Sequence, residues 1–230
     1  MLVTVLLSIS LLTVPDTAQS SDANTIVTTM LQKDAERRSA FPGYSAVRTY
    51  VLENAEHHKR AEMTVRVICR PDGTKSFEVV SESGWGGARK HVFPRLLDTE
   101  ASASKPGSRE DSAVNPENYW FRLTGIERIC GRTAYAIEVT PKAQKKYLIR
   151  GTIWVDTTDY AILRIEGSPA KSPSFFIKST TFTHTYQKNG AFWLPESDIS
   201  VSDARMFGPT QLTILYREYE LGAESAADQQ

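Results

Sequence analysis

The chain has 230 residues, of which 40% are hydrophobic and 10% aromatic, a composition that fits one folded domain with a sizeable core and excludes a disordered chain. Its 27 basic and 27 acidic residues cancel at neutral pH. Because no strong field of either sign results, the charge balance gives no indication of a nucleic-acid ligand or an acidic partner.

The first 20 residues have the pattern of an export signal. Residues 1–14 are mostly apolar and are followed by Pro15 and by small and polar residues through Ser20. The apolar run is too short to span a membrane, which takes about 20 residues, but it fits the core of a secretory signal cleaved near Ala18 to Ser20. No Lys or Arg precedes the run, so a buried N-terminal strand is the alternative. We assign residues 1–20 to a signal peptide and expect an exported protein.

Two cysteines, Cys69 and Cys130, are present. In an exported protein an even number of cysteines suggests a disulfide, and both residues fall at predicted strand ends beside turns. A bond closing about 60 residues would stabilise the fold by roughly 4 kcal/mol in the chain-entropy model. We therefore predict a disulfide between Cys69 and Cys130, with two unrelated buried thiols as the alternative.

The predicted domain, residues 21–222, opens with a helix over residues 21–40. Arg37 and Arg38 lie in its last turn, where cations suit the helix dipole, and Pro42-Gly43 ends it. One face of this helix carries apolar residues at helical spacing, namely Ala23, Ile26, Val27, Met30, Leu31 and Ala35. Such an amphipathic helix needs an apolar surface to lie on.

Strands and a second helix follow. Residues 60–70 alternate cleanly between apolar and polar side chains, and the Pro-Asp-Gly sequence after them predicts a turn. The Gly-Trp-Gly-Gly stretch at 84–87 lacks the Lys-Ser/Thr of a phosphate-binding loop, so it predicts a flexible connection. A short helix is expected around Pro94, before an exposed polar loop at 101–113. The predicted strands of this half are 44–53, 60–70 and 75–83.

The pattern of the second half of the chain predicts strands alone, and its polar end, residues 223–230, is expected to be disordered. The predicted strands are 119–129, 133–141, a hairpin within 147–167, 175–187, 192–202 and 210–221. The total is about ten antiparallel strands and two or three helices. The fold class is therefore α+β and mainly antiparallel β.

The hairpin within residues 147–167 is apolar on both of its faces. If Val155 pairs with Tyr160, Ile153 meets Ile162 and Ile165 falls on the other face, with Trp154. A half-solvated hairpin is apolar on one face only, so both sides of this one require a cover. What covers them bears on function.

No constellation of catalytic residues is apparent. His57, His58, His91 and His184 lack the spacing of a metal site, and the chain has no Gly-x-Ser-x-Gly elbow. Two acidic pairs occur, Asp156/Asp159 in a predicted turn and Glu196/Asp198 on a predicted strand, and nothing beyond their presence supports glycosidase-type chemistry. We expect no enzymatic activity, no metal and no cofactor; a hydrolase using Glu196 or Asp198 is the least favoured alternative.

The aromatic residues point instead to a hollow that binds an apolar ligand. Four tryptophans lie on or beside predicted strands, and the helices are too few to fill a large interior. Aromatic residues also fill ordinary cores, which is the alternative for each of them. The residues predicted to form the lid and lining are Trp85, Phe93, Leu96, Leu97, Trp120 and Trp154.

Short motifs, together with the order of elements, resemble the LolA-like outer-membrane lipoprotein-sorting proteins. They are YAIEVTP at 135–141, GTIWVD at 151–156, LRIEG at 163–167 and FWLP at 192–195. The likeness covers most of residues 22–221.

This resemblance implies an open, incomplete β-barrel with the helices on its concave face and an apolar cavity that holds acyl chains. It further implies a periplasmic protein without cofactor, a carrier or chaperone for lipoproteins or other lipids, and we expect a monomer. The alternative is an envelope interaction or stress-sensing module that acts through a protein partner, as in the RseB type of the same fold.

Overall fold

The computed structural model describes residues 16–105, 112–145, 147–172, 177–205 and 208–222, with side chains from Asp22 onward. Most of the predicted signal segment and the predicted disordered tail lie outside these residues. The first helix begins at Asp16, inside the segment assigned to the signal, and ends at Ser39.

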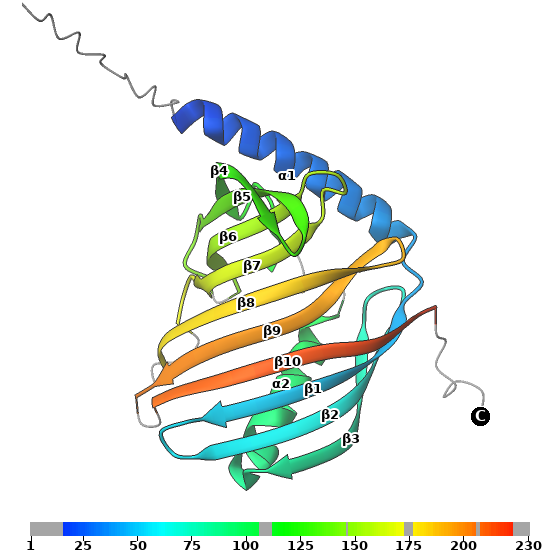
Figure 1. The fold of residues 1–230 in the computed structure, drawn as a ribbon, viewed down its shortest axis with the longest axis vertical. Coiled ribbons are helices and arrows are strands. Elements are labelled where there is room, and N and C mark those ends of the chain that lie inside the picture. Colours follow the sequence, from blue (N-terminus) through cyan, green and yellow to red (C-terminus); the bar gives the residue numbers. More distant parts are fainter. Residues whose placement is uncertain (1–15, 106–111, 146, 173–176, 206–207, 223–230) are drawn as a thin grey trace, which may run out of the picture.

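The described residues contain two α-helices, one π-helical turn and ten strands (Figure 1). The helical elements are α1 (Asp16–Ser39), η1 (Ala88–Val92) and α2 (Phe93–Ala103). The first five strands are β1 (Tyr44–Asn54), β2 (Lys59–Cys69), β3 (Lys75–Gly84), β4 (Tyr119–Ile129) and β5 (Arg132–Pro141). The last five are β6 (Ile149–Asp156), β7 (Ile162–Pro169), β8 (Ile177–Asn189), β9 (Phe192–Ala204) and β10 (Gly208–Leu221).

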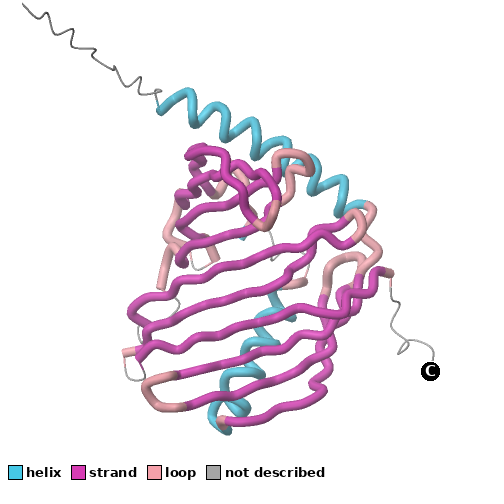
Figure 2. Tube along the Cα trace, viewed as in Figure 1, coloured by secondary structure: helices cyan, strands magenta, loops and turns pink. Residues whose placement is uncertain are grey.

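All ten strands belong to one antiparallel sheet, in the order β3-β2-β1-β10-β9-β8-β7-β6-β5-β4 (Figure 2). The pairing of β1 with β10 brings the first and last strands together in its middle. Within the described residues β3 and β4 form the two edges and do not pair with each other. The predicted fold class, an open barrel of about ten strands with helices, is therefore confirmed.

Both α-helices lie on the same face of the sheet, which we call the inner face. Residues paired directly across neighbouring strands share a face, as do residues two apart on one strand. A series of such neighbours connects β1, which lies beneath α2, with β5 to β7, which lie beneath α1. The pairs in this series are Arg48–Tyr216, Ile214–Asp198, Asp198–His184, His184–Ile165, Ile165–Ile153 and Ile153–Ile137. Figure 1 accordingly shows α2 behind β10, β1 and β2, with the outer face toward the viewer.

Helix α1 covers the inner face of β4 to β7. Four of the apolar residues predicted on one side of this helix become buried, with Val27 fully inaccessible, whereas Leu31 is partly buried and Ala35 is exposed. They form one cluster with strand residues, whose buried members are Ala23, Ile26, Val27, Met30, Tyr119, Phe121, Ile137, Val139, Leu148, Ile153, Val155 and Ile165. The sheet supplies the apolar surface that the amphipathic pattern required.

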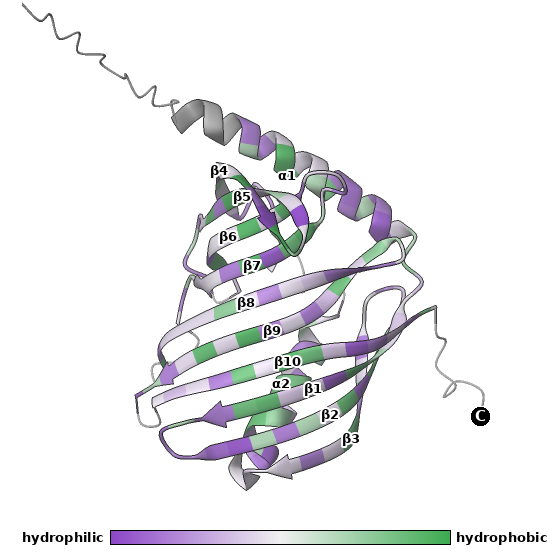
Figure 3. Cartoon of the chain, in the orientation of Figure 1, coloured by the Kyte–Doolittle hydropathy of each residue, from purple (hydrophilic) through white to green (hydrophobic). Residues whose placement is uncertain are grey.

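Helix α2 covers the inner face of β1 and β2. Phe93 is fully buried there, and four of the five alternating residues of β2 that the sequence placed on one face are buried in the same cluster, while Cys69 is buried in a neighbouring one. Figure 3 shows this alternation of hydrophobic and hydrophilic residues along the strands. The buried members of the cluster are Tyr50, Leu52, Ala61, Met63, Val65, Val67, Ala88 and Phe93.

The β6–β7 hairpin is apolar on both faces, as predicted, but its pairing differs from the prediction. Val155 pairs with Ile162 and Ile153 with Ile165, with a β-bulge between the two pairs. The turn is longer than predicted, and the bulge moves Ile165 to the inner face with Ile153. A one-residue shift of register exchanges the faces of a strand, so the prediction for Ile165 was wrong.

A pair of glycines allows the close approach of β6 and β7. Gly151 lies directly opposite Gly167. A Cβ atom added to Gly151 would lie 1.9 Å from the backbone oxygen of Glu166, and one added to Gly167 would lie 2.4 Å from that of Arg150. No side chain fits at either position, which is a common reason for glycine within a strand.

The turn between β6 and β7 is built around the buried carboxylate of Asp156. Its Oδ1 accepts hydrogen bonds from the backbone nitrogens of Thr158 (2.9 Å) and Asp159 (2.6 Å), and its Oδ2 accepts one from Arg132 Nε (2.6 Å). Burial, the largest influence, acts to raise the pKa of Asp156, but Arg132 and the backbone donors outweigh it and hold the pKa below its usual value. Arg37 of α1 donates to the carbonyl of Asp159 (3.0 Å), so the same turn fixes the end of the helix.

The predicted disulfide is absent. Cys69 and Cys130 are both thiols, the first buried and the second exposed. Cys69 ends β2, near one edge of the sheet, and Cys130 follows β4, the opposite edge. Their similar positions beside turns did not reveal that the two turns belong to opposite ends of the sheet.

Candidate functional site

Among the described residues, the inner face is covered incompletely between α1 and α2. Side chains beneath the two helices are buried, whereas nine on the inner face of β8, β9 and β10 are half-exposed. They form three cross-strand rows, which we call the open floor: Thr180–Ser202–Thr210, Phe182–Ser200–Leu212 and His184–Asp198–Ile214. The spacing of strands and residues makes this surface about 10 Å wide and about 14 Å long.

The open floor combines apolar and hydrogen-bonding groups. Phe182, Leu212 and Ile214 are its apolar members, and Leu212 and Ile214 pack against the cluster beneath α2. At one end the hydroxyls of Thr180 and Ser202 lie 2.9 Å apart and bond to each other. The surface can therefore contact a hydrocarbon while it offers polar groups at its ends.

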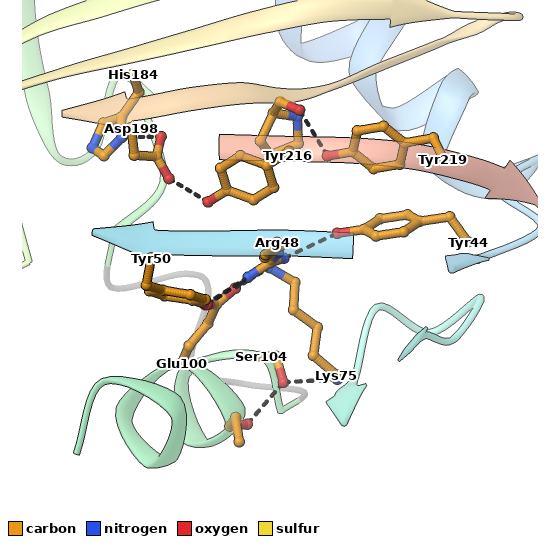
Figure 4. Close-up of polar contacts among 12 residues, drawn as sticks. Tyr44, Arg48, Tyr50, Lys75, Glu100, Ser104, His184, Asp198, Tyr216 and Tyr219 are labelled. Atoms are coloured by element: carbon orange, nitrogen blue, oxygen red, sulfur yellow. Dashed lines mark hydrogen bonds and ion pairs between the residues drawn. The ribbon is translucent and has the colours of Figure 1, made fainter. Parts of the chain in front are cut away.

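A chain of polar contacts leads from the open floor into the core (Figure 4). His184 Nδ1 lies 2.5 Å from Asp198 Oδ1, and the hydroxyl of Tyr216 donates to Asp198 Oδ2. Burial, followed by the charge of Asp198, raises the pKa of Tyr216, so this phenol stays protonated as a donor. The Asp198 carboxylate thus accepts from a buried group on one side and meets a half-exposed imidazole on the other.

Arg48 lies next to this chain and is fully buried. Its Nη1 donates to both carboxylate oxygens of Glu100 on α2, at 2.7 and 2.8 Å. Its guanidinium carbon lies 4.5 Å from the centroid of the Tyr216 ring, a cation–π contact. The hydroxyls of Tyr44 and Tyr50 accept further hydrogen bonds from it, at 3.3 and 3.4 Å. A charge taken out of water is in this way paired and hydrogen-bonded.

The same carboxylate joins α2 to β3. Lys75 Nζ lies 2.7 Å from Glu100 Oε1, and the backbone nitrogen of Lys75 donates to Ser104 Oγ at 3.0 Å. Burial, the largest influence, acts to raise the pKa of Glu100, but Lys75 and Arg48 together lower it. Glu100 is therefore held ionised, and α2 is fixed to the sheet by polar contacts as well as by its apolar side.

The predicted lid and lining residues divide into two groups. Phe93, Leu96, Leu97 and Trp85 lie together in or against the cluster beneath α2. Trp120 does not join them, because Tyr119 and Phe121 on either side of it face α1 and its own ring points outward, 65% exposed.

Trp154 is on the outer face as well. It is buried there in a small cluster with Ala134, Ala136 and Leu163, and its Nε1 donates to Glu127 at 2.9 Å. The structure therefore places Trp154 in a filled outer cluster, away from the inner face.

The acidic pairs noted in the sequence have different surroundings. Asp156 and Asp159 shape the hairpin turn, as predicted for turn formers. Glu196 is exposed at a β-bulge, while Asp198 faces inward. Within the described part of the chain no three His, Cys, Asp or Glu side chains gather as a metal site, and no helix is long and apolar enough to cross a membrane.

Sequence reasoning missed Arg48, Glu100 and the contacts of Asp198 with His184 and Tyr216. Arg48 could have been found, since the alternation of β1 puts it on the same face as Tyr50 and four further inward-facing residues that are otherwise uncharged. An arginine at a position of the buried face requires an acid partner. The other contacts join residues on different strands and depend on pairing that local patterns do not contain.

Comparison with protein families finds one match. Residues 111–216 match a family described as "Family of unknown function (DUF5686)". The matched segment contains His184, Asp198 and Tyr216, but not Arg48. A search of curated proteins finds no match to the sequence.

Several solved structures are similar in fold. A domain described as an outer membrane lipoprotein-sorting protein, from Vibrio parahaemolyticus, is 14% identical with a TM-score of 0.49, over 91% of this chain and 97% of that one. A LolA superfamily protein from Nitrosomonas europaea is 11% identical, with a TM-score of 0.42, over 87% and 95%. The MucA/MucB complex of Pseudomonas aeruginosa matches at 13% identity and a TM-score of 0.30, over 86% and 99%. The descriptions of the first two name the family that the sequence motifs resemble.

Proposed function

We propose that the chain is a periplasmic carrier or chaperone that binds the acyl chain of a lipid or lipoprotein on the open floor between α1 and α2. The observation that supports this most is the half-exposed inner face of β8 to β10, which neither helix covers. If the sheet had no ligand to bind, larger side chains that filled this surface would make the fold more stable. The sequence motifs that resemble lipoprotein-sorting proteins supply the ligand class.

The energetics of such a site are reasonable. Each buried methylene contributes about 0.8 kcal/mol, so eight of them laid over Phe182, Leu212 and Ile214 contribute about 6 kcal/mol before the costs of association. Leu212 and Ile214 also pack against the cluster beneath α2, so the floor adjoins apolar side chains on that side. An acyl chain could thus exchange water for protein along most of its length.

Binding of a fluorescent fatty acid to delipidated protein, followed by fluorescence polarisation, tests this function. Ser200 lies in the central row of the open floor, and its neighbour Ile199 points to the outer face. We expect Ser200→Trp to weaken binding at least tenfold by filling the floor, and Ile199→Trp, the matched control, to leave it unchanged. A wild-type protein that does not bind, or equal effects of the two substitutions, would refute the proposal.

The exposed edge strand β3 favours a second candidate, an envelope module that pairs with an extended segment of a partner protein. Val79 and Val80 on this edge are 49% and 57% exposed. Unpaired edges with apolar side chains are common sites of strand addition. This candidate predicts that Val79→Lys abolishes recovery of a periplasmic protein partner while fatty-acid binding stays as in the wild type. Recovery of a protein without any co-purified lipid would favour it.

A further inference from the structure

His184 is the half-exposed end of the polar chain described above. It lies in the end row of the open floor, and 36% of its side chain is exposed, against 20% for Asp198. Tyr216, the third member, is buried. In Figure 4 these three residues lie in succession across β8, β9 and β10. The imidazole is thus the member of the chain that a ligand on the floor would meet.

The ring is held in one orientation by two contacts. Its Nδ1 meets Asp198 at 2.5 Å, and its centroid lies 4.7 Å from that of Phe182, with 37° between the planes. The other carboxylate oxygen of Asp198 accepts a hydrogen bond from Tyr216, which holds the Asp198 side chain in place. A partner that fixes one ring nitrogen decides what the other nitrogen can do, as when a carboxylate bonds to the far nitrogen of a metal-binding histidine.

The bonding also assigns the tautomer. An ionised carboxylate only accepts hydrogen bonds, so Nδ1 carries the proton that lies toward Asp198. In the neutral ring Nε2 is then an acceptor with a lone pair. Among the described residues Nε2 has no hydrogen-bond partner, and the hydroxyl pair of Thr180 and Ser202 lies at the opposite end of the open floor.

A ligand that covers the ring must therefore satisfy Nε2 or leave it buried and unpaired. An acyl chain with a donor next to it would supply a hydrogen bond, whereas one without a donor would remove water from Nε2 and give nothing in return. Phe182 adjoins the His184 ring and Ile214 lies beyond Asp198 in the same row, so these two side chains would hold the first methylenes of the chain.

We propose that His184 Nε2 is the head-group contact of this site, an acceptor that selects acyl ligands whose head offers an O–H or N–H donor. This inference rests on the proposed acyl-binding function and adds the class of head group. A glycerol hydroxyl and the amide N–H of an N-acylated chain share this chemistry.

Ligand pairs that differ only in the donor test the proposal. Displacement of a fluorescent fatty acid at pH 8, where histidine is ordinarily neutral, would compare 2-hydroxyethyl palmitate with 2-methoxyethyl palmitate. A second pair, N-methylpalmitamide and N,N-dimethylpalmitamide, distinguishes amide from hydroxyl donors. We expect the donor to improve affinity roughly tenfold in at least one pair.

Three variants connect this preference to His184. His184→Phe keeps a ring beside Phe182 but removes the acceptor, so the preference should fall to about one. Asp198→Asn should do the same through the tautomer, since its amide N–H would donate to Nδ1 and place the proton on Nε2. Thr183→Phe, on the outer face of the same strand, is the control and should keep the preference.

The outcomes separate the two proposals. If neither ligand of a pair displaces the probe, both the acyl-binding function and this inference are overturned. If both ligands of each pair bind the wild type equally well, or if His184→Phe keeps the tenfold preference, the head-group contact alone is wrong. Circular dichroism melting of each variant confirms that the comparison is made on folded protein.

Discussion

The ion pair between Arg48 and Glu100 should be the most sensitive polar contact of the fold. Glu100→Gln leaves a fully buried guanidinium without its counter-charge, and removal of one partner of a buried pair costs about 3–5 kcal/mol. The Glu100 side chain is 27% exposed, and Arg48 keeps the Tyr216 ring, so we expect the lower end, about 3 kcal/mol. For a domain of this size that loss lowers the melting temperature by about 6–12 °C.

Thermal and urea unfolding, followed by circular dichroism, measure this loss. The double variant Arg48→Met with Glu100→Gln removes both charges and should be more stable than the sum of the single effects predicts. The exposed pair Arg66–Glu78 is a matched control between strands, and Glu78→Gln should leave the melting temperature unchanged. If Glu100→Gln costs no more than Glu78→Gln, or if the two single effects simply add, Arg48 does not depend on Glu100 and the reasoning is wrong.

The other predictions concern pH, packing and thiols. The pKa of Asp156 is lowered in the folded protein, so its contribution to stability is fully present above the unfolded pKa of about 3.9 and is lost as the pH falls through the folded pKa. The difference in melting temperature between the wild type and Asp156→Asn should therefore close below about pH 4. A difference that stays constant with pH contradicts this. Gly167→Ala should cost about 2 kcal/mol or more in urea unfolding, whereas Gly125→Ala, where a Cβ meets nothing within 4 Å, should be neutral. Thiol titration of unreduced protein should find Cys130 reactive in the folded state and Cys69 only after denaturation, and no thiols at all would contradict the structure.

Local periodicity predicted the elements and most of their buried faces. In β2 every second residue from Ala61 to Cys69 was expected on one face, and those residues are buried. In α1 the predicted apolar stripe includes Ala23 and Met30, and both are buried against the sheet. These predictions succeed because a strand or helix repeats its own geometry, which fixes the side-chain direction without reference to the rest of the chain.

Pairing between distant strands was not predictable in this way. The junction of β1 with β10 joins residues more than 150 positions apart and creates the contact of Arg48 with Tyr216. The failed disulfide has the same cause, since Cys69 and Cys130 both follow the local rule for strand ends and their distance depends on sheet order.

A strand that is apolar on both sides does not reveal which side faces inward. Trp120 and Trp154 were expected to line a hollow, yet in each case the neighbouring residues face α1 and the tryptophan faces outward. The indole of Trp154 is buried on the outer face and donates a hydrogen bond to Glu127, so this face offers a packed site with an acceptor.

The β6–β7 hairpin and the open floor differ in the kinds of residues that they carry. The hairpin is rich in large apolar residues because both of its faces are filled, the inner one against α1 and the outer one around Trp154. The inner face of β8 to β10 differs, because it carries threonine and serine beside Phe182 and Ile214, and the proposed acyl ligand would need a surface that its own side chains leave unfilled. In a sheet of this kind the density of aromatic residues marks the core, so a search for a ligand site should begin at inward-facing positions where small hydroxyl residues replace them.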